Sequence, residues 1–148
     1  MAGHNDLAAD RRRVLIVDDE ADIAEILAEI VMGEGHLVEV AANGRDALAR
    51  IRASAFDLIL SDLIMPELDG PGFWRALRST APQMLTRIVF ITGDTLGEPA
   101  QRFLSEANRP VIEKPFVPDE VRRVLRCELA AGASTGACGT ASGGMPRR

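Results

Sequence analysis

Residues 14–19, Val14-Leu15-Ile16-Val17-Asp18-Asp19, are four apolar residues followed by two carboxylates. The same arrangement, an apolar run that ends in polar residues, recurs at Leu58-Ile59-Leu60-Ser61-Asp62, at Ile88-Val89-Phe90-Ile91-Thr92 and at Val111-Ile112-Glu113-Lys114. Short apolar runs of this kind are typical of buried parallel strands. The carboxyl ends of parallel strands lie at one edge of their sheet. We therefore expect a set of polar residues to converge at that edge: Asp18, Asp19, Asp62, Thr92 and Lys114.

Segments with helical periodicity alternate with these strands, and such alternation is the pattern of βαβ units. An apolar stripe on the first helix, which includes Ile26, is expected to face the sheet. The predicted fold class is α/β, a doubly wound parallel sheet with helices on both faces. Strands are expected near residues 14–18, 37–41, 57–62, 87–92 and 110–114, and helices near 20–34, 43–53, 71–79, 96–107 and 118–130.

The length and composition of the chain indicate one folded domain. It has 148 residues, of which 47% are hydrophobic and 26% are charged, as a soluble core of ordinary size requires. We expect the domain to span residues 13–130. Residues 1–12 are expected to form a flexible arm, and residues 131–148, rich in Ala, Gly and Ser, a flexible tail. The tail is too short and too poor in large apolar residues to be an output domain.

Composition also limits the cellular compartment and the classes of partner that we expect for this protein. No apolar run approaches the roughly 20 residues of a membrane helix, and the N-terminus has no apolar secretion segment, so a cytoplasmic protein without membrane contact is expected. A net charge of −5 argues against direct binding of nucleic acid. Cys127 and Cys138 lack metal-type spacing, and in a reducing compartment both are expected to remain thiols.

The expected cluster of polar residues has a definite chemistry. Three carboxylates that meet within a few Å repel one another unless a cation neutralises them, and the all-oxygen set of Asp18, Asp19 and Asp62 suits Mg²⁺. An aspartate can attack phosphorus as a nucleophile. Lys114 and Thr92 could then bind oxygens of the phosphoryl group. The set therefore indicates a phosphoryl-transfer site that uses Mg²⁺.

A group of short motifs resembles the receiver domain of two-component response regulators. The motifs are Asp18-Asp19, Asp62 followed by Met65-Pro66 and Asp69-Gly70, Thr92-Gly93, and Lys114-Pro115-Phe116. The resemblance covers about residues 13–130. It implies a flavodoxin-like (βα)5 fold with strand order 2-1-3-4-5, and a cis peptide bond between Lys114 and Pro115.

The resemblance also implies a role for each residue of the site. Asp62 would be the phosphoacceptor. Mg²⁺ would be bound directly by Asp19, Asp62 and the backbone carbonyl of Ile64, with Asp18 acting mostly through water. Thr92 would be the switch hydroxyl, and Lys114 would be the phosphate-binding cation.

The partner that the resemblance implies is a histidine kinase or a histidine phosphotransfer protein. The domain would catalyse only its own phosphorylation and dephosphorylation, so it would not be an enzyme, and it would pass the signal on by changing conformation as a monomer or weak homodimer. The motifs are most similar to receivers at the C-terminus of hybrid histidine kinases. The chain is thus either a free-standing regulator or a fragment of such a kinase.

Two positions depart from the family pattern. Val111 stands where the family has an aromatic residue that turns inward on activation, and valine has no ring to swing. Transmission through Thr92 and the loop at 93–97 is therefore expected instead. Asp94 adds a carboxylate near the site, which we expect to modulate the lifetime of the phosphoryl group.

Other functions fit the residues less well. Asp18 and Asp19 alone could be helix caps, but capping does not account for Asp62, Thr92 and Lys114 at three other strand ends. A phosphatase of the haloacid dehalogenase type needs its nucleophile in an Asp-x-Asp motif after the first strand, where this chain has adjacent aspartates. A flavodoxin-like electron carrier would need a Ser/Thr-rich phosphate loop there, and a DNA-binding regulator would need an output domain.

Overall fold

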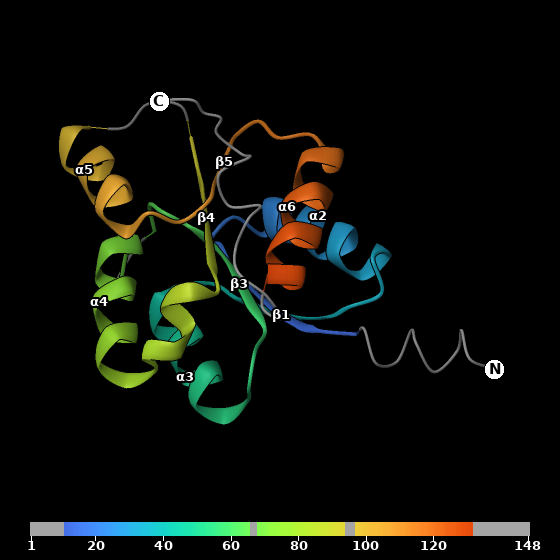
Figure 1. Cartoon of the computed structure of the whole chain (residues 1–148), viewed down its shortest axis with the longest axis horizontal. Coiled ribbons are helices and arrows are strands. Elements are labelled where there is room, and N and C mark those ends of the chain that lie inside the picture. The colour runs from blue at the N-terminus through green and yellow to red at the C-terminus, as the bar shows by residue number, and fades with distance from the viewer. Residues whose placement is uncertain (1–10, 66–67, 94–96, 132–148) are drawn as a thin grey trace.

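The computed structural model describes residues 11–65, 68–93 and 97–131. These residues form a parallel sheet of five strands with the order β2-β1-β3-β4-β5, which confirms the predicted fold class and strand order (Figure 1). Asp94, most of the 93–97 loop, and almost all of the predicted arm and tail lie outside the described residues. The strands are β1 (Arg13–Val17), β2 (Leu37–Ala41), β3 (Leu58–Asp62), β4 (Ile88–Thr92) and β5 (Val111–Glu113).

Helices cover both faces of the sheet (Figure 1). Because successive strand residues point to opposite faces, Val14 and Ile16 pack in one core cluster and Leu15 and Val17 in the other. The first cluster is closed by α2 and α6, and the second by α3, α4 and α5. The helices are α2 (Ala21–Gly33), α3 (Gly44–Ala53), α4 (Gly70–Thr80), α5 (Glu98–Ala107) and α6 (Pro118–Ala131), with a 3-10 helix, η1 (Pro82–Thr86), that the sequence did not predict.

Local signals explain where the helices begin and end. The side chain of Asn43 accepts a hydrogen bond of 2.8 Å from the backbone N–H of Asp46 and caps α3. Asp69 caps α4 in the same way through Gly72, at 3.0 Å. After α2, Gly35 has a φ of +94°, a backbone conformation that favours glycine.

Some apolar positions on α2 and β2 are more exposed than the sequence pattern predicts. Ile26 on α2 is 44% exposed, so it lies at the margin of the apolar stripe rather than within it. Strand β2 is at the edge of the sheet, and its Val40 is 38% exposed. Strand β2 is therefore less buried than β1, β3 and β4, because an edge strand lacks a neighbour on one side.

Gly70, the first residue of α4, contacts the backbone that directly follows β3. The N–H of Gly70 donates to the carbonyl of Leu63 at 2.8 Å, and a Cβ atom built on Gly70 would lie 2.9 Å from that same carbonyl oxygen. The start of α4 is therefore held against the backbone immediately after Asp62.

Contacts through α6 hold it to the rest of the domain. Arg126 donates to both carboxylate oxygens of Glu34 at the end of α2, at 2.8 and 3.1 Å. Arg109 donates to Glu128 at 2.6 Å.

Cys127 is in a disulfide, so the prediction that it remains a thiol is wrong, and Cys138 lies outside the described residues. None of the helices in the described part of the chain has the length and apolar character needed to cross a membrane.

Candidate functional site

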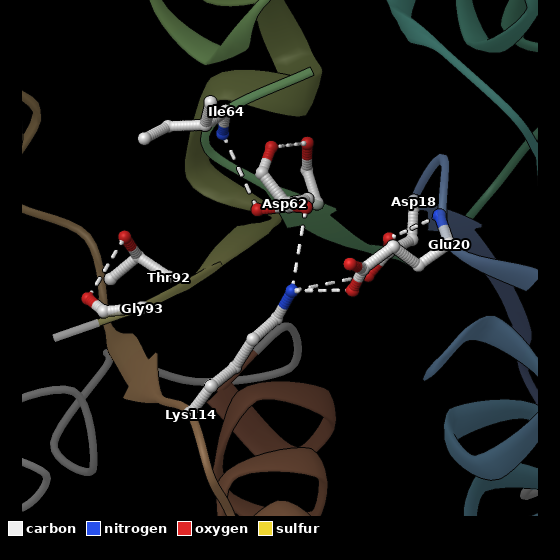
Figure 2. Close-up of polar contacts among 8 residues, drawn as sticks. Asp18, Glu20, Asp62, Ile64, Thr92, Gly93 and Lys114 are labelled. Carbon is white, nitrogen blue, oxygen red and sulfur yellow. Dashed lines mark hydrogen bonds and ion pairs between the residues drawn. The ribbon is translucent and has the colours of Figure 1, made fainter. Parts of the chain in front are cut away.

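The carboxyl edge of the sheet brings the expected polar residues together. Asp18 directly follows β1, Asp62 and Thr92 end β3 and β4, and Lys114 directly follows β5. The strands end nearly level, because Val17 pairs with Ser61, Asp62 with Ile91, and Thr92 with Glu113. The side chains of Asp18, Asp62 and Lys114 meet at this edge, as Figure 2 shows.

Three carboxylates form a cluster there. Asp18, Asp19 and Asp62 each place an oxygen within 4.8 Å of the others. Asp18 is 3% exposed and Asp62 is 7% exposed, whereas Asp19 is exposed. An all-oxygen cluster with one side open to solvent could hold a metal ion, and hard cations such as Mg²⁺ prefer such ligands.

Asp18 has an oxygen without a hydrogen bond. Its Oδ1 accepts from the backbone N–H of Glu20 at 2.8 Å, but its buried Oδ2 has no hydrogen-bond partner. Lys114 Nζ lies 3.7 Å from that oxygen. The pKa of Asp18 is raised to about 6, mainly by burial and to a lesser extent by the charge of nearby Asp62, against the opposing effects of the Glu20 N–H and Lys114. The single charge of Lys114 therefore does not offset all of the neighbouring carboxylates, and a bound cation would offset the remaining negative charge.

Both carboxylate oxygens of Asp62 accept hydrogen bonds, whereas only one oxygen of Asp18 does. Its Oδ1 accepts from the backbone N–H of Ile64 at 3.3 Å, and its Oδ2 accepts from Lys114 Nζ at 3.4 Å (Figure 2). Burial nonetheless raises the pKa of Asp62 above its ordinary value, although Lys114 and the backbone N–H of Ile64 act in the other direction. The carboxylate is thus held by one cation and one amide while it borders the rest of the cluster.

Lys114 contacts three carboxylates. Its Nζ lies 3.4 Å from Asp62, 3.7 Å from Asp18 and 3.7 Å from Glu20. Burial disfavours the ammonium form, but the charges of Asp62, Asp18 and Glu20 outweigh it and raise the pKa of Lys114. Glu20 is not among the site residues predicted from the sequence, although its place directly after the aspartate pair could have indicated it.

A family model matches the part of the chain that builds this site. The match is to the response regulator receiver domain and covers residues 14–126. The chain belongs to this family. The resemblance noted in the sequence is thereby confirmed, and the strand order of the receiver agrees with it.

Individual relatives agree with the family match. The DNA-binding response regulator MtrA of Mycobacterium tuberculosis is 34% identical over 119 residues, which cover 80% of this chain and 51% of MtrA. A CheY-like receiver domain protein of Methanospirillum hungatei is 28% identical with a TM-score of 0.76, over 85% of this chain and 99% of that one. Chemotaxis protein CheY4 of Vibrio cholerae is 29% identical with a TM-score of 0.70, over 78% and 97%. The chain thus spans about half the length of MtrA and nearly the whole of each solved receiver.

Two of the predicted site residues do not contact the cluster through their side chains. In this receiver Thr92 is 2% exposed, and its hydroxyl donates to the carbonyl of Gly93 at 3.4 Å rather than to Asp62. The side chain of Ile64 is directed away from the cluster and Ile64 is 63% exposed, while its backbone N–H bonds Asp62 (Figure 2). The switch role of Thr92 and the metal-binding role of the Ile64 carbonyl remain predictions.

The neighbourhood of Val111 is aromatic although Val111 is not. Val111 pairs with Phe90 in the sheet and packs, partly buried, in the cluster under α4 and α5. The ring of Phe90 lies 5.4 Å from Phe103 on α5 and 6.1 Å from Trp74 on α4. Trp74 therefore packs in the core, and the receiver places aromatic rings beneath α5 from β4 and α4. The peptide bond between Lys114 and Pro115 is cis, as expected.

Proposed function

We propose that this receiver accepts a phosphoryl group on Asp62 from a phosphohistidine of a partner histidine kinase or phosphotransfer protein, in a reaction that requires Mg²⁺. The observation that carries the proposal is the arrangement around the Asp62 carboxylate. It is paired with Lys114 at 3.4 Å and shares a cluster with Asp18 and Asp19, in which one buried oxygen of Asp18 has no hydrogen bond.

The transfer is a substitution at phosphorus. A carboxylate oxygen of Asp62 forms a new P–O bond while the P–N bond of the phosphohistidine breaks, and the electron pair of that bond stays on the histidine nitrogen. Lys114 would bind a phosphoryl oxygen as a point charge. Mg²⁺ held by Asp18, Asp19 and Asp62, with the carbonyl of Ile64, would offset the negative charge of the carboxylates and the phosphoryl group.

Phosphorylation would also produce the signal. It replaces the single charge of Asp62 by roughly two and adds acceptor oxygens, so Lys114 and the hydroxyl of Thr92 gain a new partner. Thr92 would have to turn away from the Gly93 carbonyl that it now bonds. Because Val111 has no ring to swing, the change would pass from Thr92 through the following loop to α5. The domain would act only on itself, in the cytoplasm, as a monomer or weak homodimer.

The test is phosphorylation by a small donor. Incubation with acetyl phosphate and Mg²⁺ should add one phosphoryl group to the intact mass, and the adduct should be stable in acid and labile in base. Asp62→Asn should abolish the adduct, whereas Asp22→Asn, a matched change at an exposed position on α2, should retain it. An adduct that persists in Asp62→Asn, or that forms equally well in excess chelator, would contradict the proposal.

A further inference from the structure

Glu20 differs from the other two carboxylates that contact Lys114. Its Oε1 lies 3.7 Å from Lys114 Nζ, and its side chain is 63% exposed. The side chain of Asp18 is 1% exposed and that of Asp62 is 9% exposed. Glu20 therefore lies at the solvent-exposed mouth of the site, where its carboxylate can also contact water.

The backbone of Glu20 is fixed although its side chain is exposed. Its N–H donates to Asp18 Oδ1 at 2.8 Å, and its carbonyl accepts from the N–H of Ala24 at 3.0 Å. Glu20 occupies the N-cap position of α2, but its side chain makes no capping hydrogen bond. The carboxylate is directed to Lys114 instead.

Glu20 also lies outside the acidic cluster. The group that could hold a metal ion consists of Asp18, Asp19 and Asp62. A cation that satisfies this cluster would neutralise two of the three carboxylates that contact Lys114. Glu20 is then the carboxylate that keeps its full attraction for the ammonium group.

We propose that Glu20 is a positioning residue, which holds the ammonium group of Lys114 in competition with the phosphoryl group on Asp62. This inference rests on the proposed function. Before phosphorylation, Glu20 shares the lysine and keeps it near the mouth of the site. A phosphoryl group on Asp62 carries more negative charge than Glu20 and attracts the lysine away from it. The attraction of Glu20 therefore determines how readily Lys114 moves to bind the phosphoryl group.

Glu20→Gln tests this role, because it keeps the shape of the side chain and removes its charge. We expect the rate of phosphorylation by acetyl phosphate with saturating Mg²⁺ to rise about two- to fivefold, the range expected for an exposed ion pair. The difference should shrink as ionic strength rises from about 0.05 M to about 1 M, where screening acts over about 3 Å. In a Lys114→Gln background, the second substitution at Glu20 should change the rate much less.

The matched control is Glu25→Gln, which removes the same charge from an exposed position on the same helix. It should leave the rate within about 1.5-fold of wild type, because charges on an exposed face are largely screened. Equal rates for Glu20→Gln and Glu25→Gln, a slower Glu20→Gln, or an increase that persists at high salt would each overturn the inference. If wild type forms the adduct and Glu20→Gln does not differ from it, the proposed function stands and this inference alone fails. If wild type forms no adduct, both fail.

Discussion

Lys114 Nζ lies 3.4 Å from Asp62 Oδ2 although strand β4 lies between β3, which ends at Asp62, and β5, which ends just before Lys114. The lysine side chain therefore spans the width of a whole strand, since neighbouring strands lie about 4.8 Å apart. Its backbone is held at the far side, where the N–H of Lys114 donates to the carbonyl of Thr92 at 2.8 Å. A lysine can make this reach and still keep its ammonium group partly in water.

The pH dependence of stability should reveal the buried carboxyl of Asp18. Its pKa is about 6 in the folded chain against an ordinary value of 3.8, so the folded state binds this proton more tightly than the unfolded state. The resulting stabilisation is complete below about pH 4 and is lost as the pH rises through about 6, at a cost of up to about 3 kcal/mol. Urea unfolding in chelator across this range measures the effect.

The diagnostic quantity for that experiment is the difference between wild type and Asp18→Asn. Arg126 lowers the pKa of Glu34 by its hydrogen bond, so Glu34 contributes stability that is lost as the pH falls, and the total curve mixes both trends. Subtracting the Asp18→Asn curve removes the contribution of Glu34. Asp18→Asn should be the more stable chain near pH 7.5 without metal. A wild-type chain that gains stability relative to Asp18→Asn between pH 4 and 6 would contradict the expected sign.

Magnesium should stabilise the fold through the same carboxylates. A ligand at 100 times its dissociation constant raises the free energy of unfolding by about 2.7 kcal/mol when it binds only the folded chain. We expect a Mg²⁺-dependent increase in the melting temperature of wild type that is greatly reduced in Asp19→Asn, the exposed member of the cluster. Asp22→Asn is the control for a charge lost from the neighbouring surface. An equal increase in all three chains would mean that Mg²⁺ binds elsewhere.

The contact between Gly70 and Leu63 should tolerate no side chain. A Cβ atom at Gly70 would lie 2.6 Å from Leu63 Cδ1 and 2.9 Å from the Leu63 carbonyl oxygen, and the backbone atom has little freedom to move away. Gly70→Ala should therefore lower the free energy of unfolding by about 1–3 kcal/mol. Gly33→Ala, where no heavy atom lies within 4 Å of the added group, should leave it unchanged or raise it by up to about 1 kcal/mol. Urea unfolding of both variants makes the comparison, and equal stability would argue against this packing.

Thr92 should be dispensable for the chemistry but required for the signal. Trp74 lies 5.9 Å from Phe103 on α5, so its fluorescence should report a movement of that helix. Beryllofluoride, a mimic of the phosphoryl group, should change Trp74 emission in wild type and in Thr92→Ser. Thr92→Val should bind the mimic without that change, because it lacks the hydroxyl. The same emission change in Thr92→Val would exclude transmission through this hydroxyl.

The sequence predicted the sheet well because its strands are simple. Runs such as that of Leu58 to Leu60 are apolar, short and buried, and they ended close to the predicted boundaries. The convergence of Asp18, Asp62 and Lys114 followed from the parallel arrangement of the strands, whose carboxyl ends share one edge of the sheet. The exposure of Val40 did not follow from its own apolar run, because such a run does not show that its strand lies at the edge of the sheet.

Side-chain choices within the site were harder to predict. Nothing in the pattern distinguishes a glutamate that caps a helix from one that reaches a lysine from another strand, so Glu20 was missed. The hydroxyl of Thr92 could bond a carbonyl or a carboxylate with equal ease, and in this structure it bonds Gly93. Such alternatives differ by one rotation about a side-chain bond, which the order of residues does not encode.

The buried oxygen of Asp18 that accepts no hydrogen bond sets a limit on how this domain can be improved by mutation. A substitution that removes the buried charge should make the protein more heat-resistant, and the same substitution removes a ligand that the phosphoryl chemistry would use. A library screened for thermal tolerance alone should therefore accumulate changes at position 18 and lose signalling at the same time. Selection for both properties should leave Asp18 in place and gather its stabilising changes far from the carboxyl edge of the sheet.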